Sequence, residues 1–277
     1  MKLSWTDRIT VLYNLLVVVF IAAFSNRIGG YSWHLAFNVS VIFFVLLLSL
    51  ERGNNTILRL VRLWYPIGLY TFLYYQTGLI NRVIFPDFLD AYFMGLDVKI
   101  FGSFPGFILY GDGGNALLDE FFHFFYFSYY LIIPVTGFVL YRKDGKLFEK
   151  YVFQISLLFY LCYLIYIFLP VEGPIGLRIE HYHDGGLFRS LVDFIYKKGE
   201  NPGAAFPSSH VAVSLLIAWW GNRFMGKWRV CYWSIFVFLS VATIYCMFHY
   251  AVDVIGGILL AVLFLFFFNF FKGREGS

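Results

Sequence analysis

Apolar runs of roughly 20 residues recur along the whole chain, and they constrain the fold more than any other feature. A helix that crosses a hydrocarbon core about 30 Å thick needs a run of about this length. The 277 residues are 60% hydrophobic and only 14% charged, with a mean hydropathy of +0.71. Such a composition lies outside the range of soluble domains. We therefore predict an all-α fold, a polytopic bundle of membrane-spanning helices.

We expect about eight spans. Residues 9–26 could instead be a signal peptide, since Lys2 and Arg8 precede them and Ala23-Phe-Ser25 lies at their end, but a second apolar run follows at once and favours a retained helix. The stretch from Arg229 to Phe271 is too long for one crossing, so we divide it near residues 245–249. The expected spans are residues 9–26, 32–50, 63–80, 118–141, 151–170, 208–226, 229–245 and 249–271.

Two long connections and the basic residues predict the orientation. The connections, residues 81–117 with a Gly111-Asp-Gly-Gly114 turn and residues 171–207, should carry short helices in the membrane interface. The termini and the loops at residues 51–62, 142–150 and 222–229 hold 14 of the 21 Lys and Arg residues but 5 of the 17 acidic ones. Because basic residues mark the cytoplasmic side, both termini should be cytoplasmic and both long connections extracytoplasmic. The basic residues do not cluster on one face, so we expect no nucleic-acid partner.

Neither the cysteines nor the histidine-rich loop predicts a metal site. Cys162, Cys231 and Cys246 lie within apolar runs without metal-type or disulfide-type spacing, so we interpret them as packing residues. His181-Tyr-His183-Asp184 could be a metal cluster, but we interpret it as a polar loop or a contact to a substrate headgroup. His123 could line a headgroup cavity or be hydrogen-bonded between helices. We expect no metal and no cofactor.

His249 and Asp253 are an ionisable pair inside the most apolar stretch of the chain. A charged carboxylate at the centre of a membrane helix costs about 3 kcal/mol, so such residues usually serve a function. A spacing of four places both side chains on one side of a helix, where the carboxylate can accept a hydrogen bond from one ring nitrogen and leave a lone pair on the other. Such a histidine is a competent nucleophile. The alternative is a purely structural His–Asp hydrogen bond.

A second group of polar residues occurs in Phe206-Pro-Ser-Ser-His210. Ser208 or Ser209 can cap the helix that follows. Backbone N–H groups at a helix N-terminus favour an anion such as phosphate. His210 would stand beside that anion as a general acid; an ordinary serine cap followed by an interfacial histidine is the alternative. An even number of helices between His210 and His249 puts both at the same, extracytoplasmic face.

These residues resemble the motifs of a known family. Pro207-Ser-Ser-His210 and His249-Tyr-Ala-Val-Asp253-Val-Ile-Gly256 are similar to the second and third motifs of the type 2 phosphatidic acid phosphatase superfamily, the lipid phosphate phosphatases. Upstream, the chain resembles the branch that contains inositol phosphorylceramide synthases. The segments that carry this second likeness are Leu96-Asp-Val-Lys-Ile-Phe-Gly102, the aromatic helix around Phe121 to Tyr130, and Phe168-Leu-Pro-Val-Glu-Gly-Pro174.

The resemblance implies a role for each residue. His249 would attack phosphorus and form a phosphohistidine, Asp253 would orient it, and His210 would protonate the departing alkoxide. Ser208 and the backbone at Ser209 would hold phosphate oxygens, and no metal would be required. The resemblance also implies a catalytic domain over residues 61–272 with a six-helix core, preceded by two extra helices within residues 1–60.

The sequence departs from the family pattern at three points. Thr243 stands where the third motif usually has a phosphate-binding arginine, Ser209 stands where the second has glycine, and the first motif, a lysine and then Arg-Pro, is not matched. Loss of the arginine is common in the inositol phosphorylceramide synthase branch. Because a phosphoryl transition state needs positive charge around its oxygens, Arg178 is our candidate for phosphate binding. The alternates are Lys197, Lys198 and Arg189.

We therefore predict a membrane enzyme that cleaves a phosphate ester or diphosphate of an amphiphilic lipid at the extracytoplasmic face. Water would resolve the phosphohistidine in a phosphatase. An alcohol acceptor, such as inositol or a lipid, would resolve it in a headgroup transferase of the inositol phosphorylceramide synthase type, and the sequence leaves both open. The hypothesis from another class is a non-catalytic transporter whose buried His and Asp relay protons.

Overall fold

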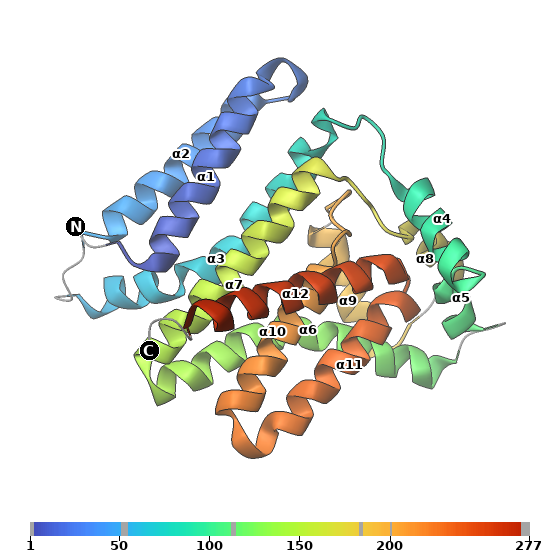
Figure 1. The fold of residues 1–277 in the computed structure, drawn as a ribbon. Helices are drawn as coiled ribbons and strands as arrows, with labels where there is room; N and C mark the ends of the chain where they lie inside the picture. The colour runs from blue at the N-terminus through green and yellow to red at the C-terminus, as the bar shows by residue number, and fades with distance from the viewer. Residues whose placement is uncertain (1–2, 51–54, 112–114, 183–184, 200, 273–277) are drawn as a thin grey trace.

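A computed structural model describes residues 3–50, 55–111, 115–182, 185–199 and 201–272 (Figure 1). Residues 112–114 of the expected glycine turn, and His183 and Asp184 of the polar loop, lie outside the described residues. Eight helices correspond to the eight expected spans. They are α1 (Trp5–Ala23), α2 (Tyr31–Leu48), α3 (Thr56–Ile80), α6 (Ala116–Lys143), α7 (Gly145–Phe168), α10 (Ser209–Phe224), α11 (Arg229–Tyr245) and α12 (Ala251–Lys272).

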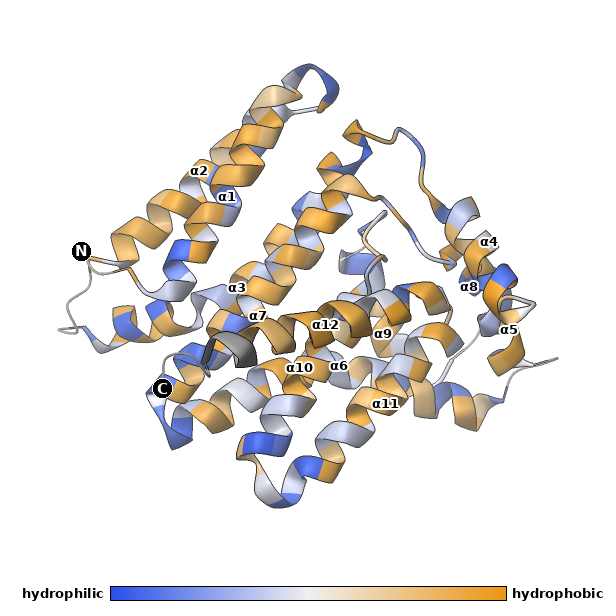
Figure 2. Cartoon of the chain, in the orientation of Figure 1, coloured by the Kyte–Doolittle hydropathy of each residue, from blue (hydrophilic) through white to orange (hydrophobic). Residues whose placement is uncertain are grey.

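The described residues contain six helices that are long and apolar enough to cross a membrane, namely α1, α2, α6, α7, α11 and α12. The other two expected spans differ: α10 has 16 residues, and the apolar residues of α3 are interrupted by basic residues and tyrosines. Figure 2 shows hydrophobic residues along the long helices and hydrophilic ones near many of their ends. The prediction of an all-α, polytopic membrane protein is confirmed.

Both long connections contain short helices, as predicted from their sequences. The first contains η2 (Asn81–Val83), α4 (Asp90–Phe101) and α5 (Pro105–Tyr110), and the second contains α8 (Ile175–His181) and α9 (Leu187–Gly199). The remaining elements are the short turns η1 (Ser25–Arg27) and η3 (Gly226–Trp228). The expected break between α11 and α12 is also present, at residues 246–250.

Side-chain caps define where many of the long helices begin. Ser4 and Asp7 form a reciprocal capping box at the start of α1, and Asn55 caps α3 through two backbone N–H groups. Asn115 caps α6 through two backbone N–H groups as well, and Asp144 caps α7 through the Lys146 N–H. Because an uncapped helix end leaves backbone N–H groups without partners, these polar residues fix the helix starts within an otherwise apolar sequence.

Helix α7 is the centre of the bundle. It contacts α1, α3, α6 and α10, and α3 and α7 lie between the α1–α2 pair and the other long helices (Figure 1). Tyr151, Tyr163 and Tyr166 of α7 are fully buried. Their hydroxyl groups find partners inside the bundle, as buried tyrosines require. The helix therefore contributes both apolar packing and polar anchors to its neighbours.

One of these anchors connects the centre of the bundle to the start of α10. The Tyr166 hydroxyl donates to the Pro207 carbonyl at 2.9 Å and accepts from the Ser209 N–H at 3.2 Å. All three groups are buried. Tyr166 therefore holds the segment that precedes His210.

Replacing Tyr166 with Phe should destabilise the protein, because a buried carbonyl and a buried N–H would each lose a partner. We expect a loss of about 1–3 kcal/mol in unfolding free energy for an unpaired buried polar group, measured by thermal or denaturant unfolding in detergent. The matched control is Tyr75→Phe, whose ring is 49% exposed. Equal stability of the two variants would contradict the anchoring role of Tyr166.

Candidate active site

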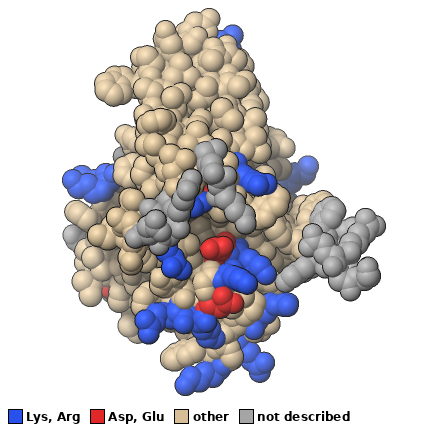
Figure 3. Space-filling view, turned by 90° about the vertical axis from the view of Figure 1, so that its left-hand side faces the viewer, with Lys and Arg blue, Asp and Glu red and all other residues tan. Residues whose placement is uncertain are grey.

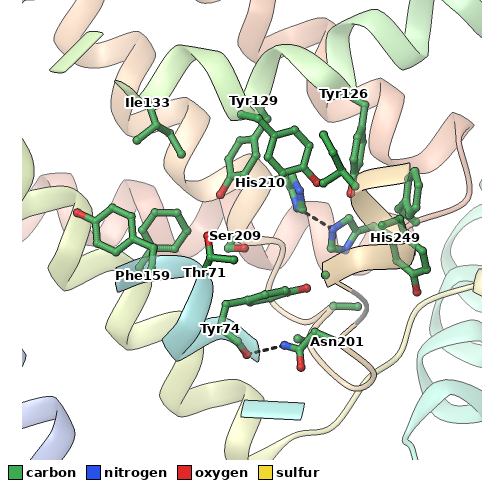
Figure 4. A pocket seen from close by; sticks show the side chains of 18 of the residues that line it. Thr71, Tyr74, Tyr126, Tyr129, Ile133, Phe159, Asn201, Ser209, His210 and His249 are labelled. Carbon is green, nitrogen blue, oxygen red and sulfur yellow. Dashed lines mark hydrogen bonds between the residues drawn. The ribbon is translucent and has the colours of Figure 1, made fainter. Parts of the chain in front are cut away.

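The structure brings His210 and His249 together. His210 is the second residue of α10, and His249 lies in the segment before α12. The distance from His249 Nε2 to His210 Nδ1 is 3.5 Å, and the ring centroids are 5.6 Å apart. Figure 4 shows the two rings facing each other at one side of a pocket. Two imidazoles from separate helices therefore converge on one place, as the sequence spacing predicts.

Ser208 caps α10 and also contacts the nucleophile candidate. Its Oγ accepts from the Val211 N–H at 3.4 Å and lies 3.2 Å from His249 Nε2. Its own N–H donates to the Asp253 carbonyl at 3.0 Å. The predicted serine cap is thus confirmed at Ser208. The Ser209 N–H, which we expected to hold a phosphate oxygen, here donates to Tyr166; Ser209 lines the pocket.

Asp253 lies beside His249, but the local geometry differs from the expected helical pair. Helix α12 begins at Ala251, so His249 precedes the helix instead of lying on it. The distance from His249 Nδ1 to Asp253 Oδ2 is 3.4 Å, without hydrogen-bond alignment. Asp253 Oδ2 instead accepts from the Tyr250 N–H at 2.9 Å, which closes the first turn of α12.

Two carboxylates of α4 hold the segment that carries His249, and the sequence interpretation missed them. Asp97 is fully buried and accepts from the N–H groups of Ala251 and Val252 at 2.8 and 3.0 Å. Both N–H groups are at the N-terminus of α12, where a carboxylate is also stabilised by the helix dipole. Burial raises the pKa of Asp97, and the two N–H groups oppose this shift.

Asp90, on the same helix, binds the neighbouring 172–173 segment and the side chain of Tyr250. It accepts from the N–H groups of Glu172 and Gly173 at 2.9 and 2.8 Å, and from the Tyr250 hydroxyl at 3.0 Å. Asp90 and Asp97 are seven residues apart, two helical turns, so they share a face of α4. This seven-residue spacing is the one feature of the sequence that could have indicated that the two carboxylates act together. The backbone partners of both residues have no signature in the sequence.

The pocket beside the histidines has a volume of about 270 Å³. Its walls come from α3, α6, α7, α9 and the loop before α10, and many of its residues are aromatic. Tyr126 and Tyr129 lie on either side of His210 in Figure 4, and Tyr74 lies beside Asn201 at another part of the pocket. Apolar residues such as Ile67, Ile133 and Phe159 line the part between α3, α6 and α7. The pocket therefore joins a polar end at the histidines to an aromatic and apolar end inside the bundle.

Arg178 approaches this region without lining the pocket. Its guanidinium is buried and contacts His123 Nε2 at 3.2 Å, the Cys246 carbonyl at 2.7 Å, and Asp193. It stacks on the Phe248 ring at 4.1 Å, and Phe248 does line the pocket. Arg178 is therefore not among the described residues that line the pocket, and its contact to phosphate stays a prediction.

The alternates to Arg178 also lie elsewhere. Arg189 is buried and pairs with Asp193, while Lys197 and Lys198 are exposed near the end of α9. The described residues that line the pocket include no Lys or Arg. His123 is hydrogen-bonded to the Asp119 carbonyl and to Arg178, which matches the structural alternative that we gave for it.

Among the described residues, no group of three or more His, Cys, Asp and Glu residues could hold a metal ion. The polar groups that line the pocket include two imidazoles, the Ser209 hydroxyl, a row of tyrosines and the side chains of Thr71, Glu172 and Asn201, and Ser208 contacts His249 from outside this lining. These groups suit nucleophilic attack and proton transfer.

We compared the sequence with models of known protein families. A model of the PAP2 superfamily matches residues 101–267, more than half of the chain. The chain belongs to the PAP2 superfamily. PAP2 membership indicates phosphatase or phosphotransferase chemistry on a lipid phosphate within a membrane. No curated protein and no solved structure matches the chain at a significant level. Helices α1 to α3, and with them the carboxylates of α4, precede the PAP2 match.

Replacing Asp97 with Ala should lower the activity, because the start of α12 would lose both of its side-chain acceptors and His249 would shift. A displacement of about 1 Å at a reacting group can cost roughly 100-fold in rate. We expect kcat to fall with little change in KM, measured on a lipid phosphate. Asp97→Asn, which keeps one acceptor oxygen, should retain more activity than Asp97→Ala.

The matched control is Lys99→Ala on the exposed side of α4, which should leave kcat unchanged. If Asp97→Ala and Lys99→Ala had the same kcat, Asp97 would not position His249. Thermal unfolding of each variant separates a loss of positioning from a loss of folding.

Proposed function

We propose that the protein cleaves a phosphate ester or diphosphate bond of a membrane lipid through a phosphohistidine on His249. The observation that carries the proposal is the approach of His249 Nε2 to His210 Nδ1 at 3.5 Å beside a pocket with an apolar end. His249 supplies the nucleophile and His210 the proton. An amphiphilic substrate fits a pocket that is polar at one end and apolar at the other.

In the first step, His249 Nε2 forms a bond to phosphorus while the bond from phosphorus to the leaving oxygen breaks. The Nδ1 side of His249 faces Asp253 at 3.4 Å, so the carboxylate can accept the Nδ1–H and stabilise the charge that develops on the ring. His210 transfers its proton to the leaving oxygen. In the second step, water or an alcohol attacks phosphorus, His210 takes its proton, and His249 is released.

The reacting phosphoryl group needs its own space between the rings. Near-attack geometry puts phosphorus about 3–3.5 Å from the nucleophile, which is the distance now occupied by the contact between His249 and His210. We infer that substrate binding separates the two imidazoles and breaks the contact from Ser208 Oγ to His249. Ser208 is then free to donate to a phosphate oxygen, which is the role that the sequence predicts for it.

We further propose that the active site faces the extracytoplasmic side and that the acceptor can be an alcohol. Lys and Arg side chains gather on the face of the molecule drawn in Figure 3, and basic residues mark the cytoplasmic side. The likeness to inositol phosphorylceramide synthases supports an alcohol acceptor, as does the hydroxyl-rich wall of the pocket. The proposal requires no metal, because the histidines supply both the nucleophile and the acid.

Substitution of His249 by Ala should abolish release of phosphate from a radiolabelled lipid phosphate, with folding retained. Purified protein is incubated with the lipid alone, with inositol, or with a lipid alcohol, and products are separated by chromatography. Free phosphate in the absence of an alcohol would exclude an obligate transferase. A labelled product that appears only with an alcohol would identify a transferase.

If the parent protein produced neither product with any lipid phosphate, the enzyme hypothesis would fail and the proton-relay transporter would remain. In that case, His249→Ala should abolish transport without any phosphate chemistry. Activity at the parental level in His249→Ala would exclude His249 as the nucleophile.

The rate should depend on pH with a bell shape. His249 must be neutral to attack, so acid reduces the rate by protonating it, whereas His210 must be protonated to act as an acid, so alkali reduces the rate. A substrate with a good leaving group, such as an aryl phosphate, needs no acid. With that substrate, the loss of rate at high pH should be smaller, and His210→Ala should retain more activity. A flat profile from about pH 5 to 9 with both substrates would contradict these roles.

A further inference from the structure

A second cavity lies at the other end of the bundle, among the starts of α1, α3 and α7. It has a volume of about 740 Å³. Along α3, Arg62 lines this cavity and Tyr74 lines the catalytic pocket. These two residues are twelve positions apart, which is about 18 Å of helix at 1.5 Å per residue. Pro66 lines the cavity and its neighbour Ile67 lines the apolar end of the catalytic pocket, so the cavity adjoins that end and contains neither histidine.

Four basic side chains from two helices line this cavity. They are Arg59 and Arg62 of α3 and Lys146 and Lys150 of α7. Arg62 pairs with the buried Asp7 at 3.2 Å. Within the part of the chain that the structure describes, Arg59, Lys146 and Lys150 are exposed and form no ion pair. The cavity also contains Glu149, so a net positive charge remains unbalanced in it.

Most of the other residues that line the cavity are apolar, apart from Ser4 and Thr6. Trp5, Leu63 and Phe153 belong to three different membrane helices, and all three line the cavity. Trp5 is 68% exposed, and tryptophan prefers the boundary between lipid and water. The cavity therefore presents cations beside an apolar surface at the depth of a lipid headgroup.

Figure 3 views the molecule from this side, which lies on the left of Figure 1. Lys and Arg side chains gather there around a smaller acidic area. The general preference of basic residues for the cytoplasmic side puts such residues on loops, but it does not require a cavity between helices. Basic pockets between membrane helices bind anionic lipid headgroups.

We propose that this cavity binds the headgroup of an anionic phospholipid from the surrounding leaflet, with its acyl chains along α1, α3 and α7. Arg59, Lys146 and Lys150 provide charge-assisted hydrogen bonds to the phosphate. The Trp5 ring covers the apolar part of the lipid near the headgroup. The site is independent of the catalytic histidines and of the lipid on which they act.

The test measures retained lipid and thermal stability of the full-length protein in detergent. Dioleoyl phosphatidylglycerol is the anionic probe, dioleoyl phosphatidylcholine is the zwitterionic comparison, and inorganic phosphate is the probe without acyl chains. The parent protein should retain phosphatidylglycerol in preference to phosphatidylcholine by native mass spectrometry, and phosphatidylglycerol should raise its unfolding temperature.

The double variant Arg59→Gln/Lys150→Gln should bind phosphatidylglycerol about tenfold to thirtyfold more weakly. The matched control is Arg223→Gln/Lys227→Gln, which removes the same charge from exposed residues of α10 and η3 that do not line the cavity. This control should bind within about twofold of the parent. Should the double variant fail to fold, Lys146→Gln alone should still weaken binding several-fold.

Equal weakening in the two double variants would mean a diffuse attraction to the basic surface and would overturn the proposal. So would equal retention of the two lipids by the parent. If inorganic phosphate gave the same rise in unfolding temperature as phosphatidylglycerol, the ligand would be a free anion and not a lipid. None of these outcomes depends on phosphatase activity.

Discussion

The close crossing of the starts of α10 and α12 is the constraint on which the rest of the structure depends. The Ser208 N–H donates to the Asp253 carbonyl at 3.0 Å, which joins the two helix starts directly through the backbone. A Cβ atom on Gly257 would lie 2.5 Å from the Ser208 carbonyl oxygen, so the helices can approach this closely only with glycine there. Because His210 is the second residue of α10 and His249 lies two residues before α12, this approach brings the imidazoles together.

The elements around this crossing provide hydrogen-bond partners for its buried backbone groups. Tyr166 of α7 satisfies the Pro207 carbonyl and the Ser209 N–H, and Asp97 of α4 satisfies the first N–H groups of α12. An unsatisfied backbone group costs several kcal/mol in an apolar environment. The two anchors thus satisfy backbone groups on both sides of the crossing, next to the ring nitrogens of His210 and His249.

Much of this architecture could be predicted from the sequence, because a membrane span is a local property of about 20 residues. The same holds for the Ser208 cap and for the convergence of the histidines, which follows from counting spans between them. The orientation and the phosphate-binding residues stay predictions. The break before α12 is harder to locate from the sequence, because residues 245–250 contain no obvious polar turn.

Features that depend on backbone partners could not be predicted in this way. Asp90 and Asp97 bind N–H groups that are 82 or more residues away in the chain, and a backbone N–H has no residue-specific signal. Arg178 was chosen as a cation near the site, but its contacts to His123, Asp193 and the Cys246 carbonyl come from three other segments. Arg178 stacks on Phe248, which lines the pocket, while Arg178 itself does not. This arrangement depends on tertiary packing and cannot be predicted from the sequence.

The central claim is that His249 carries the phosphoryl group during turnover, and trapping that intermediate tests it most directly. Enzyme that is reacting with a phosphorus-labelled lipid phosphate is denatured in alkali, digested, and mapped by mass spectrometry. The account predicts an acid-labile, alkali-stable phosphate on the peptide that contains His249, and its accumulation when His210 is replaced by Ala and the substrate has a good leaving group. Phosphate on Ser208 or Ser209, or turnover without any label on the protein, would contradict the account.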